Sequence, residues 1–309
     1  MIFALLLACA APGVLVIALD TTRADVVQPG VLPDGARVYT HAYSAAPWTS
    51  SSVYTLTTGH YPDRPASQRP PWDFGRRARI PHGYPTDAGL TWHNAALTDS
   101  VVAGWVLGVE TVADPFEEAR DLLPCGGAIY VHDLGPHQPY EAPLPSGRWS
   151  PQDEALIFTF DDAGVHPHDL SPGLRAWGWH AYHAAADDTL TRVRSLLDDA
   201  IADGWTVVLT ADHGEALGES GRWGHALSLD DEQVRVPLLV WGPGVVPGVD
   251  DQPVPATCVA ATVRAVLGEE TMGCDLRTGD VRGAVEVGML VDGEWVTRRP
   301  GTDTTTEED

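Results

Sequence analysis

The chain has 309 residues, 44% of them hydrophobic, which is enough for one large α/β domain with a substantial core. Its formal net charge of −24 argues against a nucleic-acid partner and against electrostatic docking on anionic lipid. All 19 basic residues are arginine, so no site in this protein can hold an oxyanion with a lysine.

The N-terminal segment is typical of a targeting signal. Met1 to Ala8 is an apolar run too short to span a bilayer, and Leu6 to Cys9 resembles a bacterial lipobox. This interpretation predicts an exported protein, periplasmic or anchored to the membrane as a lipoprotein through Cys9. No basic residue precedes the run, so a buried first strand with an incidental cysteine is the alternative.

Two apolar runs are predicted to be buried parallel strands with acidic residues after them. Val14 to Leu19 is followed by Asp20, and Val207 to Thr210 is followed by Asp212 and His213. Because the carboxyl ends of parallel strands meet at one edge of a sheet, the two carboxylates should converge. A carboxylate oxygen beside an imidazole nitrogen is a natural ligand pair for a divalent cation, which would also neutralise the acids.

The segment from Ala46 to Pro62 starts with hydroxyl residues and reaches Gly59 after an apolar stretch, which predicts a helix stopped by glycine. Thr49 near its start has two interpretations. As a helix N-cap, its hydroxyl would satisfy free backbone N–H groups. Alternatively, since a helix N-terminus favours a bound phosphate or sulfate, a hydroxyl next to a metal could be deprotonated and attack phosphorus. The acids at Asp20 and Asp212 favour the nucleophile.

The remaining elements follow from periodicity and turn residues. One long helix or two are predicted over Leu174 to Gly204, with an apolar stripe for packing on the sheet. Further elements are predicted as a strand at Ala128 to Val131, a strand at Val236 to Trp241, a helix at Thr257 to Leu267 and a hairpin at Val285 to Trp295. His132 and Asp133 are interpreted as strand-end residues. A Cys258–Cys274 disulfide would suit export but does not follow from the spacing.

Several motifs in the right order resemble the sulfatase branch of the alkaline-phosphatase superfamily. Asp212 to Glu215 follows a strand, Trp223-Gly224-His225 comes next, and Thr49 lies ten residues before Gly59, where sulfatases place their nucleophile. The resemblance implies an α/β fold, an alkaline-phosphatase-like three-layer sandwich with a mostly parallel central sheet. It also divides the chain into a signal or lipobox-like segment (1–11), a catalytic domain (12–270) and a small C-terminal extension with a disordered acidic tail (271–309).

The resemblance assigns roles to individual side chains. Four of them are implied as ligands of one divalent metal ion: Asp20, Thr49, Asp212 and His213. The ion would be calcium if the site is sulfatase-like, and zinc or manganese if it is phosphotransferase-like. His137, on the loop after the predicted strand at Ala128, and His225 are implied to contact the transferred group or protonate the leaving oxygen. His93 aligns loosely with a further active-site histidine, and an ordinary half-buried histidine is the alternative.

The chain also departs from true sulfatases. Thr49 cannot be converted to formylglycine, Val53 replaces the arginine of the nucleophile motif, and Thr21 stands where many relatives carry a second acid. Threonine as nucleophile resembles the phosphoethanolamine transferases, lipoteichoic-acid synthases and nucleotide phosphodiesterases of the same superfamily. The predicted function is therefore a metal-dependent hydrolase of phosphate (or sulfate) esters of small molecules, lipids or glycans. The alternatives are a phosphotransferase that moves a headgroup onto a lipid or glycan, and a degenerate, non-catalytic binding lipoprotein.

Overall fold

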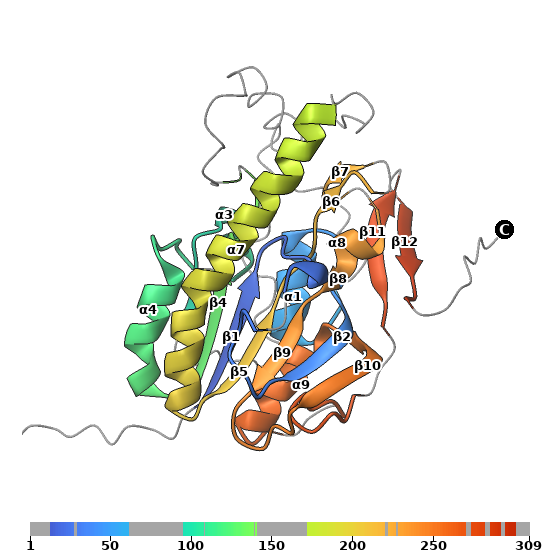
Figure 1. The fold of residues 1–309 in the computed structure, drawn as a ribbon. Coiled ribbons are helices and arrows are strands. Elements are labelled where there is room, and N and C mark those ends of the chain that lie inside the picture. Colours follow the sequence, from blue (N-terminus) through green and yellow to red (C-terminus); the bar gives the residue numbers. More distant parts are fainter. Residues whose placement is uncertain are drawn as a thin grey trace, which may run out of the picture.

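A mixed β-sheet forms the middle layer of the molecule (Figure 1). The computed structural model describes residues 13–27, 30–61, 95–107, 109–138, 140, 172–219, 222–226, 228–269, 273–281, 285–291 and 294–300. The predicted signal segment with Cys9, His93 and the acidic tail lie outside the described residues, and what the sequence predicts for them stays a prediction.

Within the described residues, eight strands make up this sheet: β1 (Val14–Leu19), β2 (Arg37–Tyr43), β3 (Ala95–Thr98), β4 (Ala128–Asp133), β5 (Thr206–Thr210), β8 (Arg235–Val236), β9 (Leu238–Trp241) and β10 (Gly248–Pro255). Their order is β10-β2-β9-β5-β1-β4-β3, and β8 pairs with β2 beside this path. The pairs β1–β4, β1–β5, β3–β4 and β2–β10 are parallel, whereas β9 runs antiparallel to β5 and β2.

Strand β1 lies in the middle of the parallel part because its whole length is apolar. All six of its residues are fully buried, as expected for a strand covered on both faces. Its register aligns Ala18 with His132 of β4 on one side and with Thr210 of β5 on the other. The residues that follow β1 and β5 therefore lie at the same edge of the sheet, as predicted.

The predicted single strand from Val236 to Trp241 is wrong in one respect. The structure divides it into β8 and β9 at Pro237. Proline has no N–H to donate to a ladder, so the pairing cannot continue through it. β8 pairs with the end of β2, at Ala42 and Tyr43, while β9 pairs with the start of β2 and with β5.

The two faces of the sheet carry separate hydrophobic cores because side chains alternate along each strand. The even-numbered residues of β1 pack with helices on one face: α1 (Thr49–Thr58), α3 (Val101–Leu107) and α9 (Thr257–Val266). The odd-numbered residues pack with helices on the other face: α4 (Pro115–Leu122) and α7 (Pro172–Ala202), which lie side by side in Figure 1. The predicted three-layer α/β sandwich with a mostly parallel sheet is confirmed.

Helix α7 is one continuous helix of 31 residues that leads into β5. Its predicted apolar stripe packs on the sheet, since Leu190, Val193 and Leu197 are fully buried in the same core as β1 and β5. In the part of the chain that the structure describes, none of the helices combines the length with the apolar character needed to cross a bilayer.

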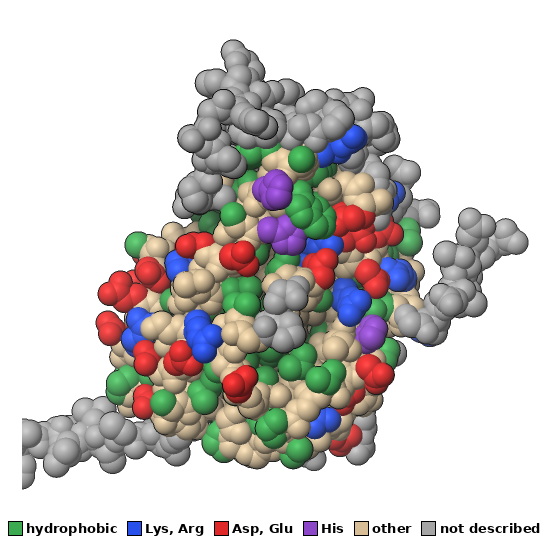
Figure 2. Space-filling model, in the orientation of Figure 1, with side chains coloured by type: hydrophobic (Ala, Val, Ile, Leu, Met, Phe, Trp, Pro, Cys, Tyr) green, Lys and Arg blue, Asp and Glu red, His purple; other side chains and the backbone are tan. Residues whose placement is uncertain are grey.

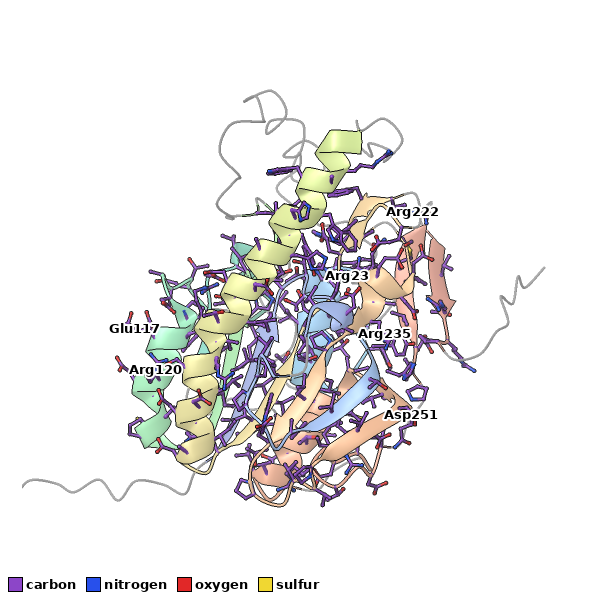
Figure 3. All side chains as sticks on the ribbon, viewed as in Figure 1. Arg23, Glu117, Arg120, Arg222, Arg235 and Asp251 are labelled. Atoms are coloured by element: carbon purple, nitrogen blue, oxygen red, sulfur yellow. A yellow bond between two sulfur atoms is a disulfide. The ribbon has the colours of Figure 1, made fainter. Side chains whose placement is uncertain are left out.

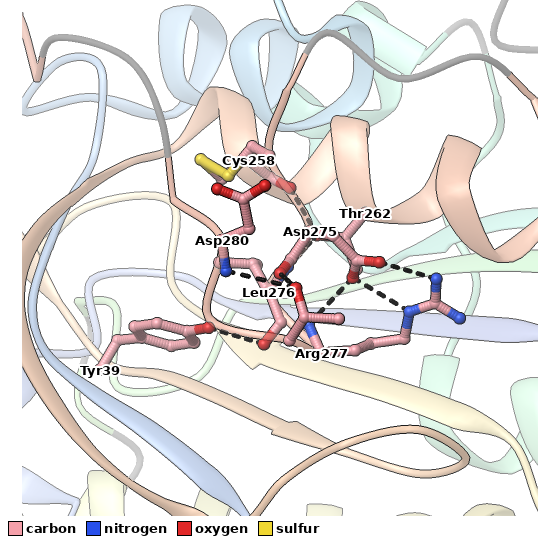
Figure 4. Close-up of a disulfide and its surroundings, with 9 residues drawn as sticks. Tyr39, Cys258, Thr262, Asp275, Leu276, Arg277 and Asp280 are labelled. Atoms are coloured by element: carbon pink, nitrogen blue, oxygen red, sulfur yellow. Dashed lines mark hydrogen bonds and ion pairs between the residues drawn. A yellow bond between two sulfur atoms is a disulfide. The ribbon is translucent and has the colours of Figure 1, made fainter.

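The C-terminal part packs onto this body through a disulfide and a hairpin. Cys258 of α9 is bonded to Cys274, and Leu276 nearby is fully buried, with its carbonyl accepting a hydrogen bond of 2.6 Å from the Tyr39 hydroxyl (Figure 4). The predicted hairpin is confirmed as two antiparallel strands, β11 (Val287–Val291) and β12 (Glu294–Arg298).

The other described elements are short: η1 (Ala24–Val26), η3 (Leu123–Cys125), β6 (Ala216–Leu217), β7 (Trp223–Gly224) and α8 (Asp231–Val234). Acidic side chains are spread over the visible face of the molecule with arginines among them, as Figure 2 shows. Ion pairs on this surface include Arg120 with Asp199 at 2.7 Å and Arg222 with Asp230 at 3.1 Å.

An acidic pair lies where β3 and β4 end. Asp99 accepts a hydrogen bond of 2.8 Å from the Leu134 amide, and the neighbouring Asp133 is bound by Arg192 of α7 at 3.1 Å. Burial, and then the charge of Asp133, raises the pKa of Asp99 to about 6. The folded state thus holds the Asp99 proton more tightly than the unfolded chain does. The stability that this proton contributes is lost as the pH rises from the pKa of Asp99 in the unfolded chain through its folded pKa of about 6.

We expect Asp99→Asn to stabilise the protein at neutral pH. Asparagine stays uncharged and keeps an oxygen for the Leu134 amide, so the melting temperature should rise by about 2–4 °C at pH 7.5. At pH 4.5 the gain should be smaller, because the wild-type carboxyl is then mostly protonated in the folded state. Thermal melts of both proteins at the two pH values check this, and a larger gain at pH 4.5 would contradict it.

Candidate functional site

Four predicted site residues meet at the carboxyl edge of the sheet. Asp20 follows β1, Asp212 and His213 follow β5, and Thr49 is the first residue of α1. His213 Nε2 lies 3.5 Å from Asp20 Oδ1, 3.6 Å from Asp212 Oδ2 and 3.3 Å from Thr49 Oγ1. One ligand atom from each of Asp20, Asp212 and His213 lies within 4.8 Å of the others, so the three can hold a metal ion.

The chemistry of this cluster fits a divalent cation. Asp20 Oδ1 is buried and makes no hydrogen bond within the described residues. Burial, and then the charge of Asp212, raises the pKa of Asp20 to about 7, and the positive charge of a bound cation would offset both effects. Burial lowers the pKa of His213 to about 4, so its imidazole is neutral at pH 7, the form that binds metal.

The Thr49 hydroxyl points into this cluster rather than along its own helix. The N-cap of α1 is Trp48, which makes no side-chain capping hydrogen bond, so the N-cap interpretation of Thr49 is wrong. The hydroxyl instead donates to Asp20 Oδ2 at 3.5 Å and lies 3.3 Å from His213 Nε2. Gly59 ends the helix with a left-handed backbone, as the sequence predicted.

Backbone hydrogen bonds hold the loop that leads into α1. The Gly288 amide of β11 donates to Ala45 O at 2.9 Å, and the Ala226 amide donates to Pro47 O at 2.8 Å. Ala226 directly follows His225 and has a positive φ of 60°, a conformation that residues other than glycine rarely adopt. The loop that carries His225 and the start of α1 at Thr49 are therefore joined directly.

The structure also brings His137 and His225 to the cluster. The ring of His225 lies 4.6 Å from that of His213 and 5.1 Å from that of His137, between centroids. Nδ1 of His225 is 2.8 Å from the carboxylate of Glu215, which is fully buried. A carboxylate can only accept here, so Nδ1 of His225 carries a hydrogen and donates it to Glu215.

His132 belongs to the same cluster, although the sequence pattern indicated only a residue at the end of a strand. Its imidazole is fully buried, and Nε2 lies 3.3 Å from Asp212 Oδ2 and 3.7 Å from Asp20 Oδ2. Burial opposes protonation, but the hydrogen bond with Asp212 raises the pKa of His132 to about 9. Burial raises the pKa of Asp212, but the electrostatic interaction with His213 and the hydrogen bond with His132 together lower it below its ordinary value.

Two side chains of this cluster were thus missed by the sequence analysis, and each left a signal in the sequence. Glu215 stands in the same short run as Asp212 and His213, directly after a buried strand. His132 lies two residues after Tyr130 on β4, and its register partner on β1 is Ala18, so all three side chains share one face of the sheet. To place Glu215 and His132 in the cluster from the sequence, one would have needed the order of the strands and the path of the loop, which the sequence did not reveal.

The loop after β1 is held in place by α7. Thr21 has a positive φ of 54°, and its carbonyl accepts a hydrogen bond of 2.9 Å from the Tyr182 hydroxyl. Arg23, labelled in Figure 3, is nearly buried and pairs with both Asp25 and Glu219. Its charge is therefore already compensated, and Arg23 holds the loop.

Comparisons with known proteins find similar sequences and similar folds. The family model described as Sulfatase matches residues 127–269. The chain is 28% identical to the low-salt glycan biosynthesis sulfotransferase Agl7 of Haloferax volcanii over 80% of its own length and 60% of that protein. It is 37% identical to choline-sulfatase of Rhizobium meliloti over 50% of its length, and 29% identical to phosphoethanolamine transferase EptA of Escherichia coli over 43%.

The chain spans only part of these relatives, 27% of choline-sulfatase and 24% of EptA. Among solved structures, the phosphonate monoester hydrolase of Agrobacterium radiobacter has a TM-score of 0.62 at 15% identity, covering 91% of this chain and 80% of that one. The periplasmic domain of EcEptC from Escherichia coli, in a complex with Zn, has a TM-score of 0.56 at 13% identity, covering 90% of each chain. These structures share the fold. Residues 127–269 thus match the Sulfatase family model, and the chain shares its fold with these solved structures.

Proposed function

We propose that this protein cleaves phosphate esters through the Thr49 hydroxyl, beside one divalent cation held by Asp20, Asp212 and His213. One observation carries the proposal: Thr49 Oγ1 lies 3.3 Å from His213 Nε2 and 3.5 Å from Asp20 Oδ2, at the first turn of α1. The hydroxyl is thus next to the candidate ligands and at a helix end that favours anions.

The cation, when bound, would supply positive charge that lowers the pKa of the Thr49 hydroxyl and offsets charge on the reacting phosphoryl group. Thr49 Oγ would lose its proton to water and form a bond to phosphorus, while the bond from phosphorus to the leaving oxygen breaks. A nearby histidine in its imidazolium form would donate a proton to that oxygen. Water would then cleave the phospho-threonine and restore the hydroxyl.

His225 is the imidazole that we assign to the leaving oxygen. Its Nδ1 lies 2.8 Å from the Glu215 carboxylate, which sets the orientation of the ring. In its imidazolium form the ring would carry a second proton on Nε2 and would give that proton to the leaving oxygen. His137, with its ring 5.1 Å from that of His225, would bind the non-bridging oxygens from the other side. His93 stays a prediction, because it lies outside the described residues.

We expect Glu215→Gln to lower kcat by about 10–100-fold with little change in metal content. The amide cannot hold the Nδ1–H of His225 as the carboxylate does, so the ring loses its preferred orientation. Steady-state kinetics with an activated and an unactivated leaving group check this. A good leaving group needs no proton, so the defect should shrink with it, and an equal defect for both esters would contradict the assignment.

The choice of phosphate over sulfate rests on Thr49 and on the absence of lysine. Formylglycine forms from a cysteine or serine, and threonine carries an extra methyl group where the aldehyde would form. A threonine alkoxide can attack phosphorus directly. The experiment is hydrolysis of a chromogenic panel, with calcium, zinc and manganese each added back after chelation. We expect phosphate esters to be cleaved. The ion that restores the highest rate after chelation is the ion that the site prefers. Efficient cleavage of aryl sulfates instead would overturn the proposal.

A transferase is the second candidate, because two of the relatives are named as transferases. The first half-reaction would be the same, and an acceptor alcohol on a lipid or glycan would replace water in the second. Turnover in the presence of added alcohols distinguishes the two. If a phosphate ester of the added alcohol increases while free phosphate decreases, the result favours the transferase.

We further propose that the protein is exported. The Cys258–Cys274 disulfide is consistent with an oxidising compartment, and the chain resembles a periplasmic domain in fold. Attachment through Cys9 remains a prediction from the sequence, since Cys9 lies outside the described residues. Fractionation of cells that express the full chain, with a Cys9→Ser variant as the matched control, tests both points.

A further inference from the structure

The Asp212 carboxylate is held from two sides. Oδ1 accepts hydrogen bonds from the backbone amides of His213 at 2.8 Å and Thr21 at 3.3 Å. Oδ2 lies 3.3 Å from Nε2 of His132, an imidazole that the proposed reaction does not use. The backbone fixes one oxygen, and His132 fixes the other.

We propose that His132 is a positioning residue that holds Asp212 and Asp20 in the orientation needed to bind the cation. The inference rests on the proposed function, because it concerns that same cation. Nε2 of His132 contacts Oδ2 of both carboxylates, at 3.3 Å for Asp212 and 3.7 Å for Asp20. The opposite oxygen of Asp20, Oδ1, makes no hydrogen bond among the described residues and is therefore free for a cation.

The register of the sheet explains how His132 reaches Asp212. His132 lies on β4 and Asp212 follows β5, so the imidazole must pass over β1. Two strand spacings amount to about 10 Å. The β1 residue directly between them, in register with both His132 and Thr210, is Ala18. Its single methyl group leaves room for the ring, whereas a larger side chain would fill that space.

A second contact holds the far side of the imidazole. Nδ1 of His132 lies 3.4 Å from the Thr98 hydroxyl of β3, which itself accepts a hydrogen bond of 2.9 Å from the Ser100 amide. The series Thr98, His132, Asp212 thus runs across the parallel sheet from its edge strand to the candidate metal site. Groups that hold a metal ligand in this way commonly change metal affinity by 10–100-fold when they are replaced.

The test measures zinc affinity of the full chain by competition with a chromogenic chelator, for the wild type, His132→Leu, His132→Gln and Ala18→Val. We expect His132→Leu to weaken zinc binding by about 10–100-fold, and His132→Gln to weaken it less because its amide can still donate. Ala18→Val leaves the imidazole intact but displaces it, so it should weaken zinc binding too. His180→Gln, a histidine exposed on α7, is the matched control and should bind like the wild type.

The visible spectrum of the Co²⁺-loaded protein separates positioning from ligation. If His132 only positions the carboxylates, the bands of the variants keep their wavelengths, since the ligand set is unchanged. A band shift in His132→Leu with unchanged bands in Ala18→Val would make His132 a ligand and overturn the proposal. Wild-type affinity in folded His132→Leu and Ala18→Val, with folding checked by circular dichroism, would reduce His132 to a packing residue. If the wild type itself bound no metal, the result would contradict the proposed function, and with it the role of His132.

Discussion

Replacing Thr49 with alanine should reduce turnover of phosphate esters by about 10³-fold or more, while the protein keeps its metal. The hydroxyl that would form the covalent bond is lost, but Asp20, Asp212 and His213 remain to hold the cation. Initial rates on a chromogenic phosphate ester and metal content after desalting are the two measurements. Both measurements must be made on the same preparation, because the prediction is that activity is lost while the metal content is kept.

Two variants make this result specific. Thr49→Ser keeps a hydroxyl at the start of α1 and should retain a measurable part of the activity. Thr55→Ala removes a buried hydroxyl of the same helix, whose hydrogen bond within the described residues goes to the Ser51 carbonyl, and it should turn over like the wild type. If Thr49→Ala kept its activity, the attacking group would be a water molecule and not the side chain.

Replacing Asp212 with asparagine should remove both metal and activity. Asparagine has nearly the same shape, but it lacks the charge that would bind the cation. The backbone donors at Thr21 and His213 would then face a neutral oxygen, and His132 would lose its ionic partner. We expect less than one-tenth of the wild-type metal after desalting, and a loss of activity that added metal does not restore.

Asp133→Asn is the matched control for this variant. Asp133 is also buried where a central strand ends, but it pairs with Arg192 of α7 and not with the candidate ligands. It should keep metal and activity, with some loss of thermal stability because Arg192 loses a charged partner. Equal metal loss in both variants would mean that the buried acids act through general stability rather than through ligation.

The parts of this protein that could be predicted from sequence are those set by local pattern. The apolar run before Asp20 and the β-branched run before Asp212 determined two parallel strands, and strand direction alone brought both acids to one edge. The long helix before β5 followed from its stripe of apolar residues. The broad fold and the resemblance to sulfatases are confirmed, whereas the domain boundaries and the catalytic roles stay predictions.

What the sequence could not reveal depends on contacts between strands that are distant in the chain. The reach of His132 to Asp212 depends on the order β4-β1-β5 and on a small residue at Ala18. The direction of the Thr49 hydroxyl depends on one residue of helix register, because the cap is Trp48. Helix propensities cannot fix the first residue of α1 to within one position, whereas the packing of α1 against the sheet does.

The bonds that hold the loop before α1 are made by backbone atoms, at Ala45 with Gly288 and at Pro47 with Ala226. Every residue type has a carbonyl, and every residue type except proline has an amide, so these two links do not depend on which side chains surround them. Mutations in the neighbouring loops can therefore exchange the surrounding side chains without moving Thr49 relative to His225. Under the proposed mechanism, such a frame would let a lineage change its acceptor, from water to an alcohol or back, through substitutions that leave the alignment of Thr49 and His225 untouched.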